Sequence, residues 1–396
     1  MEHNLNRREL IRSIVAGMAI PLAPIGIASA AQRTGRRLIL VELSGANDGL
    51  NTVIPINDDR YFEIRPNIAL SKDKVFDIGN DLALNSELRP LDPAFQSGDM
   101  AVIQGLGYPG QNRSHFKSIA LWETGGDGNQ AGKNGWLTED IEEMMGSDEL
   151  DAHGISLDGG MGVFLSSSGV WLSMTSLNQF SSLSATTEKL ASNTQTNSTN
   201  PALSMIVDRG NTLNNSMASI SGKIKRLNRH RDIRYDAGEF GRQAAMAAQL
   251  IDAGIDAPVL KIKLDGFDTH EYQIWRHPNL LRDLGRGLAG LRKSLIRSGH
   301  WESTLIMTYS EFGRRALENE SEGTDHGTAA PHFMLSGAIK GGIWGVHPDL
   351  GDLVEGDMKF TMDYRSVYAS ILSDWFKIPL NRFSEYSNEN LLSIYT

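Results

Sequence analysis

Histidines and carboxylates occur together at several points where an apolar segment of the sequence gives way to a glycine-containing loop. The most compact example is Asp325-His326, which lies between two glycines in GTDHGTAAPHFMLSG. The segment LDGFDTH likewise combines an aspartate, Asp268, with a histidine, His270. Glu311 comes directly after the apolar segment LIMTYS. An aspartate in such a loop is often only a turn former, because its side chain accepts hydrogen bonds from nearby backbone groups. The alternative for these residue types is a metal or catalytic site.

Asp48, in SGANDGLN, adds a further carboxylate. The negative charges of these carboxylates would repel one another if the side chains met at one place. Like charges raise each other's pKa values, and a divalent cation is the usual way to offset them. The chain has no cysteine, which excludes disulfides, cysteine nucleophiles, thiolate ligands and iron–sulfur clusters. Oxygen and nitrogen donors without sulfur therefore predict zinc, with manganese, magnesium or calcium as alternatives.

The segment NRSHF places Arg113 and Ser114 where a loop becomes a predicted helix. A serine at this position is commonly a helix cap, which is worth about 1 kcal/mol. Alternatively, its hydroxyl is a nucleophile in the positive field of the helix N-terminus, where an anionic phosphate is also favoured. Arg113 could then hold a phosphate or sulfate oxygen. The neighbouring His115 faces either this site or the core.

Continuous apolar runs that end at these polar loops predict buried strands of a parallel sheet. We expect strands at 38–43 and 101–104 and within 258–270, 303–314 and 332–337, and helices from about 115 and at 239–254, 279–299 and 364–378. The alternation of strands and helices predicts an α/β fold with a mainly parallel sheet. Ligands of open α/β sheets bind outside the carboxyl ends of the strands, which is where these polar residues fall.

The bulk composition is that of a globular protein. The chain has 396 residues, of which 40% are hydrophobic and 22% charged, so it can bury a large core. The formal net charge is -10, and we therefore expect no general affinity for nucleic acid or for an anionic membrane.

The N-terminus resembles a twin-arginine export signal. Arg7-Arg8 precede a weak apolar run that ends in the small-residue stretch Ala28-Ser29-Ala30, a typical cleavage site. The alternative is a chance arginine pair before a buried helix. We predict a signal peptide at 1–30, a single domain at 31–396 with a Ser/Thr/Asn-rich excursion around 175–201, and a periplasmic or secreted location. The apolar run is too interrupted for a good transmembrane helix, so no stable membrane span is expected in the mature chain.

Taken together, the motifs resemble those of a bacterial family known by a domain-of-unknown-function label (fifteen-oh-one). The similarity covers nearly the whole chain, and it is carried by the segments LSGANDGLN, NRSHF, DGFDTHEYQ, YSEFGRR, GTDHGTAAPHFMLSG and DYRSVYASIL. This family is grouped with the alkaline phosphatase–sulfatase superfamily, whose members hydrolyse phosphate or sulfate esters, usually with two metals. The resemblance implies an alkaline phosphatase-like three-layer sandwich with helices on both faces of the sheet.

The resemblance also implies roles for individual residues. Asp48 matches a metal-binding carboxylate after the first strand, and Ser114 matches a nucleophile at a helix cap that bridges the metals. The remaining matches are Asp268 with His270 at the other metal, Glu311 as a second carboxylate, and His326 as a last ligand. Asp325 is then either a ligand itself or the group that orients His326.

Two departures from the superfamily pattern bear on function. Phe312 stands where a histidine often follows the later carboxylate, so one metal is expected to be weakly held or absent. The formylglycine sulfatase motif C/S-x-P-x-R is not matched by GYPGQNRS, so that mechanism is not expected.

The chain is thus predicted to be an exported metal-dependent hydrolase of phosphate or related anionic esters. The alternative is a non-catalytic binding or assembly protein that keeps the fold. Neither the substrate nor the oligomeric state follows from the sequence.

Overall fold

The computed structural model describes residues 35–126, 128, 130–145, 150–191, 201–226, 235–387 and 394–395. Residues Thr34–Thr396 form one compact unit. The predicted signal peptide lies outside the described residues. None of the helices in the described ranges is both long enough and apolar enough to cross a membrane.

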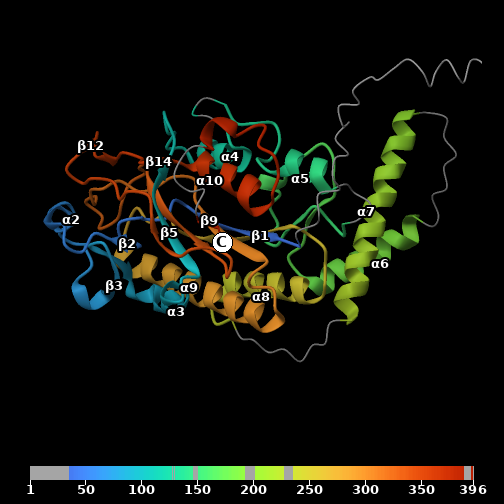
Figure 1. Cartoon of the computed structure of the whole chain (residues 1–396), viewed down its shortest axis with the longest axis horizontal. Helices are drawn as coiled ribbons and strands as arrows, with labels where there is room; N and C mark the ends of the chain where they lie inside the picture. Colours follow the sequence, from blue (N-terminus) through green and yellow to red (C-terminus); the bar gives the residue numbers. More distant parts are fainter. Residues whose placement is uncertain are drawn as a thin grey trace, which may run out of the picture. The chain divides into compact units, whose positions relative to one another are not determined.

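A mixed, mainly parallel sheet forms the centre of this unit (Figure 1). Its strands lie in the order β11-β5-β10-β9-β1-β8-β6-β7, and β14 pairs with β5 outside this path. Their bounds are β1 Arg37–Ser44, β5 Met100–Gly107, β6 Gly154–Ser156, β7 Trp171–Ser173, β8 Val259–Asp265, β9 Thr304–Tyr309, β10 Ala330–Leu335, β11 Gly342–Trp344 and β14 Met362–Asp363. Among these strands β10 alone is antiparallel to its neighbours, β5 and β9. The predicted α/β class with a mainly parallel sheet is confirmed.

Helices cover both faces of the sheet and make the fold a three-layer sandwich (Figure 1). The helices are α2 Asp59–Ile64, α3 Asp92–Gln96, α4 His115–Thr124, α5 Thr138–Met145, α6 Leu177–Ala191, α7 Pro201–Arg226, α8 Gly238–Asp252, α9 Gln273–Ser298 and α10 Tyr364–Ser370. The remaining described strands form two small sheets. One joins β2 Val53–Ile54, β4 Leu82–Asn85 and β3 Val75–Gly79, and the other joins β12 Leu353–Val354 and β13 Asp357–Met358.

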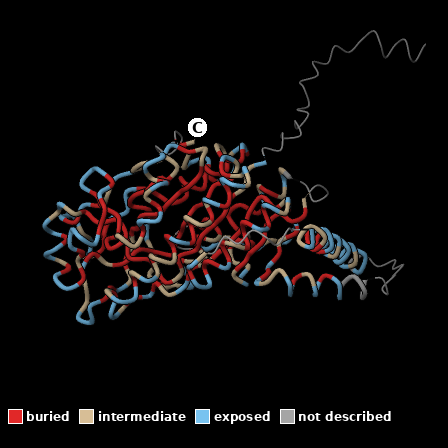
Figure 2. The backbone as a smooth tube through the Cα atoms, turned by 90° about the horizontal axis from the view of Figure 1, so that it is seen from below, coloured by how far each residue is buried: buried red, intermediate tan, exposed pale blue. Residues whose placement is uncertain are grey.

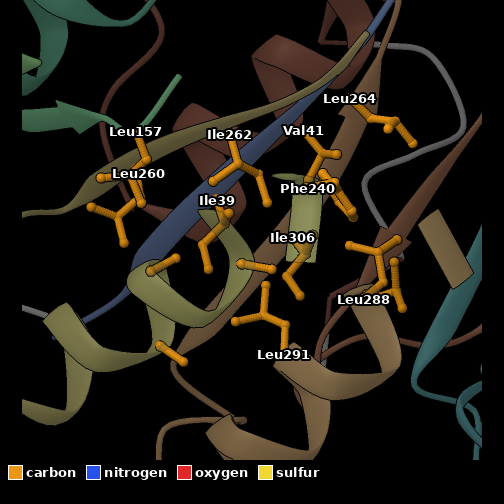
Figure 3. Close-up of a cluster of buried hydrophobic side chains, with 14 of the residues drawn as sticks. Ile39, Val41, Leu157, Phe240, Leu260, Ile262, Leu264, Leu288, Leu291 and Ile306 are labelled. Carbon is orange, nitrogen blue, oxygen red and sulfur yellow. The ribbon is translucent and has the colours of Figure 1, made fainter. Parts of the chain in front are cut away.

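Side chains of β1 alternate between the two helical layers. Ile39 and Val41 pack with residues of α8 and α9, including Phe240 and Leu288 (Figure 3). Leu40 on the opposite side belongs to the cluster formed with α4 and α10. The central strands are buried on both faces, and buried residues concentrate along them (Figure 2). Burial of each such side chain contributes about 1.5–3 kcal/mol. A strand that is buried on both faces therefore has apolar residues at consecutive positions, and such continuous runs predicted these strands.

Two segments differ from their prediction. The helix expected at 279–299 begins at Gln273 and continues through Pro278. Proline lacks the N–H group that an interior helical position uses, but Gln273 and His277 are both buried against other elements, and these tertiary contacts offset the lost hydrogen bond. The excursion around 175–201 contains helix α6, and its residues 192–200 lie outside the described part of the chain.

The reversed direction of β10 has a consequence for the polar loops. The carboxyl ends of β1, β5, β8 and β9 lie at one edge of the sheet, since these strands are parallel. Because β10 runs the other way, the loop that precedes it reaches this same edge. Asp325-His326, before β10, thereby meets residues that follow β8 and β9.

Candidate metal centre

Three histidines and one aspartate converge at this edge of the sheet. His115 is the first residue of α4, Asp268 and His270 follow β8, and His326 precedes β10. The Nε2 atom of His326 lies 3.0 Å from Nε2 of His115 and 2.9 Å from Nε2 of His270. Oδ1 of Asp268 lies 3.4 Å from Nε2 of His115, 3.0 Å from Nε2 of His270 and 3.2 Å from Nε2 of His326. We call these four residues the donor cluster.

Each imidazole of the donor cluster is held by its other nitrogen. Nδ1 of His115 lies 2.7 Å from Oε1 of Glu311, and Nδ1 of His270 lies 3.1 Å from Oδ1 of Asp325. Nδ1 of His326 lies 2.8 Å from the backbone carbonyl oxygen of Arg113. A carbonyl or carboxylate oxygen can only accept a hydrogen bond, so each Nδ1 carries the proton and donates it. In a neutral ring, Nε2 then carries no proton and presents its lone pair.

Burial tends to raise the pKa values of Glu311 and Asp325, but hydrogen bonds outweigh it and lower both. The main stabilising partner of the Glu311 carboxylate is His115, and those of the Asp325 carboxylate are Asn319 and His270. Both groups are therefore ionised acceptors near neutral pH. The hydrogen bond that His115 donates to Glu311 also raises the pKa of His115, whereas burial lowers the pKa of His326.

The donor set fits a transition-metal ion. Two imidazole lone pairs about 3 Å apart repel each other unless a proton or a cation lies between them. Ligand atoms around tetrahedral zinc, with bonds of about 2.0–2.1 Å, lie about 3.3–3.4 Å apart, close to the separations in the cluster. A histidine ligand that donates its second N–H to a carboxylate or a carbonyl is also the usual arrangement at metal sites. His115, Asp268 and His326 meet the distance requirement for a shared ion, and His270 extends this triad.

Arg314 fixes the loops that carry the donor cluster. Its side chain is fully buried, and Nη2 donates to Oδ1 of Asp268 at 2.6 Å. The same guanidinium donates to the backbone carbonyls of Gly45, Ala46, Phe267 and Thr324. Burial alone would raise the pKa of Asp268, but the hydrogen bond and charge of Arg314 lower it to about 2. The Asp268 carboxylate, which is 47% exposed, is therefore ionised and open to solvent on one side.

Glycines on each side of Asp325-His326 permit close packing of this loop. A Cβ atom on Gly323 would lie 2.2 Å from the backbone of His270, and one on Gly327 would lie 2.4 Å from the backbone of Arg314. Any side chain there would push the loop away from the segments that supply the other donors.

Asp48 has a different set of partners. It is fully buried, and Arg65 binds it through two hydrogen bonds of 2.6 and 3.0 Å. Gln273 also donates to this carboxylate. Burial acts to raise the pKa of Asp48, but Arg65 outweighs it and the pKa is lowered. Removing one partner of such a buried pair typically costs about 3–5 kcal/mol. The structure thus joins Asp48 to an internal cation and does not place it among the converging donors.

Ser114 immediately precedes the first histidine of the cluster. It occupies the N-cap position of α4, but its hydroxyl makes no capping hydrogen bond, and its backbone N–H donates to Oδ1 of Asn112 at 2.8 Å. The hydroxyl is therefore not committed to holding the helix. Arg113 contributes its carbonyl to His326, and its half-exposed guanidinium forms an ion pair with the buried Asp357.

Phe312, in the position where a histidine was expected, packs against two histidines of the cluster. It is buried, and its ring centroid lies 5.0 Å from that of His115 and 4.8 Å from that of His326. Glu311 and Asp325 contact histidines through Nδ1 rather than joining the converging donor atoms. Asp325 contacts Nδ1 of His270 rather than its neighbour His326.

Sequence reasoning left His115 undecided between site and core, and the structure brings it into the donor cluster. The available signal was its place directly after Ser114 at the start of a helix. Two other histidines lie elsewhere. His332 is fully buried in β10, where burial lowers its pKa to about 3. His347 bonds the carbonyl of Pro348.

Residues 101–378 match the family described as "Protein of unknown function (DUF1501)". The match covers more than half of the chain, and the chain belongs to this family. The resemblance noted in the sequence is therefore confirmed. No match was found among curated proteins.

Several solved structures resemble the chain. Ps i-CgsB is 8% identical, with 90% of this chain and 75% of that one covered and a TM-score of 0.43. The lipoteichoic acid synthase LtaP from Listeria monocytogenes is 9% identical, with coverage of 92% and 77% and a TM-score of 0.40. The C-terminal periplasmic domain of EcEptC from Escherichia coli, solved in complex with Zn, is 6% identical, with coverage of 78% and 74% and a TM-score of 0.36.

Proposed function

We propose that this protein is an exported, metal-dependent hydrolase of phosphate or related anionic esters. The observation that carries the proposal is the donor cluster, in which the Nε2 atoms of three imidazoles converge with Oδ1 of Asp268. His115, His270, His326 and Asp268 would hold one ion, with zinc the best fit to nitrogen-rich donors. When bound, such an ion polarises an ester oxygen and offsets charge that develops in the transition state.

Residues beside the cluster supply the remaining chemistry. Ser114 follows Arg113 and precedes His115, and its hydroxyl is not used as a cap, so it is our candidate nucleophile. Its Oγ atom would form a bond to phosphorus or sulfur while the bond to the ester oxygen breaks. The serine proton passes to solvent, and the leaving alkoxide takes up a proton. Water then hydrolyses the serine ester and regenerates the hydroxyl.

Asp48 and Phe312 bear on the number of ions. Arg65 occupies both oxygens of Asp48, and Phe312 offers no donor atom. The described residues therefore support one ion for each chain, fewer than the two that are usual in the superfamily.

We expect purified protein, equilibrated with zinc and then desalted, to retain about one ion for each chain in elemental analysis. Metal-loaded protein should hydrolyse members of a panel of aryl phosphate monoesters, aryl phosphate diesters and aryl sulfates. Chelation should remove both the ion and the turnover, and addition of zinc should restore both. Protein that binds an ion but turns over no ester would support a binding or assembly role instead.

Export can be tested separately from the chemistry. Replacing Arg7-Arg8 by a lysine pair should block twin-arginine export and leave uncleaved, folded chain in the cytoplasm. Cell fractionation with an antibody to the chain measures this. A single exchange at Arg36, outside the proposed signal, serves as the control. Equal periplasmic amounts of parent and double variant would contradict twin-arginine export.

A further inference from the structure

Large aromatic side chains are exposed at residues close in sequence to the donor cluster. Phe116 is 89% exposed and Trp275 is 71% exposed, and they are the two most exposed large apolar side chains among the described residues. Tyr272 is 61% exposed. Single exposed apolar residues are common on proteins, but here the two most exposed ones belong to the helices α4 and α9 that begin at the site. We call Phe116, Tyr272 and Trp275 the aromatic rim.

The chain itself keeps the aromatic rim close to the donors. Phe116 follows His115 directly, and consecutive Cα atoms lie about 3.8 Å apart. Tyr272 comes two residues after His270, so their Cα atoms are within about 7 Å. Trp275 lies in the first turn of α9, where its backbone N–H donates to the carbonyl of Tyr272 at 3.1 Å. The backbone positions of Phe116 and Tyr272 are thus fixed within about 7 Å of donor-cluster Cα atoms.

The backbone under Tyr272 is strained and firmly held. Tyr272 has φ +49°, a left-handed conformation that residues other than glycine rarely adopt. Its N–H donates to the carbonyl of Ser321 at 3.1 Å, and that of Gln273 donates to Glu322 at 3.0 Å. The Gln273 side chain also bonds Thr269 and Thr324. Backbone strain that the surrounding structure maintains recurs at ligand-binding positions.

We propose that the aromatic rim binds the organic part of the substrate, and that this part contains a ring with a flat apolar face, either aryl or sugar. This inference rests on the proposed function, because the anionic end of the same molecule would lie at the donor cluster. Tyr and Trp rings give a large contact area at a small entropic cost, since they have only two side-chain torsions. Exposed aromatic side chains close to a polar centre suit a compact ring bearing an anionic ester.

Charge argues against a membrane as the occupant of the aromatic rim. The exposed carboxylates near the rim, Glu271, Glu320 and Glu322, outnumber the exposed cations next to it, Lys117 and Arg276. The whole chain has a formal net charge of -10. Attachment to anionic lipid surfaces normally uses clustered lysine and arginine. Acidic neighbours would repel such a surface.

The test compares four non-hydrolysed anions by calorimetry on zinc-loaded, full-length protein. The anions are inorganic phosphate, methylphosphonate, phenylphosphonate and the phosphonate analogue of glucose 6-phosphate. We expect at least one ring-bearing phosphonate to bind about tenfold more tightly than methylphosphonate. Preference for the phenyl or for the hexose compound identifies the ring as aryl or sugar.

Variants of the aromatic rim test whether these residues cause the preference for ring-bearing phosphonates. Trp275→Ala and Phe116→Ala should bring the ring-bearing phosphonates to within about twofold of methylphosphonate while leaving affinity for inorganic phosphate unchanged, and Trp275→Phe should keep most of the preference. Exposed positions such as these rarely affect folding. Leu213→Ala, at a 41% exposed residue on α7, is the control and should behave like the parent.

The possible failures are distinct. Equal affinity for phosphate and all three phosphonates would overturn the inference that the aromatic rim binds a ring. The proposed function would then remain. Protein that binds none of the anions would overturn both. Binding to phosphatidylcholine vesicles that Trp275→Ala abolishes would also overturn the inference, because the aromatic rim would then insert into a membrane.

Discussion

Replacing His326 by alanine should reduce metal affinity by more than about 100-fold and abolish ester turnover. His326 is central to the donor cluster, because its Nε2 atom lies within 3.2 Å of His115, His270 and Asp268. Removal of a partner that only orients a ligand typically costs about 10–100-fold in metal affinity, so loss of a donor atom should cost more. Competition with a chromophoric chelator measures the affinity.

A graded series of variants tests the same geometry. Asp325→Asn should weaken zinc by about 10–100-fold, because Asp325 holds His270 without donating to the ion. His300→Ala, at a half-exposed histidine outside the cluster, should bind zinc like the parent. Zinc should also raise the melting temperature of the parent and of His300→Ala, because a ligand that binds only the folded state stabilises it. It should not do so for His326→Ala.

Asp48→Asn separates the structural assignment of this residue from the role that the sequence suggested. The variant should unfold at a lower temperature, because Arg65 would lose the charge that it faces in the interior. Folded Asp48→Asn protein should nevertheless bind about one zinc ion with the affinity of the parent. Loss of the ion from folded protein would show that Asp48 is a ligand and that the donor cluster is incomplete without it.

Replacing Ser114 by alanine should lower ester turnover by several orders of magnitude without removing the metal. An activated nucleophile and an adjacent ion act as a unit, so loss of the nucleophile removes most of the rate. Stability should change by well under the roughly 1 kcal/mol of a typical cap, since the Ser114 hydroxyl makes no capping hydrogen bond. The measurements are bound zinc, melting temperature and turnover of the best substrate from the ester panel.

Ser118→Ala is a matched control on the same helix. The Ser118 hydroxyl is buried and bonds the carbonyl of Asn112, so this variant should lose some stability and keep its turnover for each folded molecule. Turnover that survives in Ser114→Ala would exclude Ser114 as nucleophile and leave water as the attacking group. Trapping of a covalent phosphoryl group on Ser114 after rapid acid quenching would support the serine directly.

The sequence by itself determined the fold class and the edge at which polar residues gather. Apolar runs such as 38–43 are long enough to be buried on both faces, and the structure has strands there. The loops after β8 and β9 were expected at this edge because ligands lie at the carboxyl ends of parallel strands. The loop before β10 reaches the same edge only because β10 runs antiparallel to its neighbours. Asp268, His270 and His326 do converge there.

Tertiary structure decided which atoms face one another. Asp48, Glu311 and Asp325 look alike in sequence, since each is a carboxylate in a loop. Their environments separate them, because Arg65 binds the first while the other two hold the Nδ1 atoms of His115 and His270. His115 was undecided because a helix-start histidine can point either way. Only the packing of α4 against the loop of His326 sets its direction, and packing between segments 211 residues apart leaves no local pattern in the sequence.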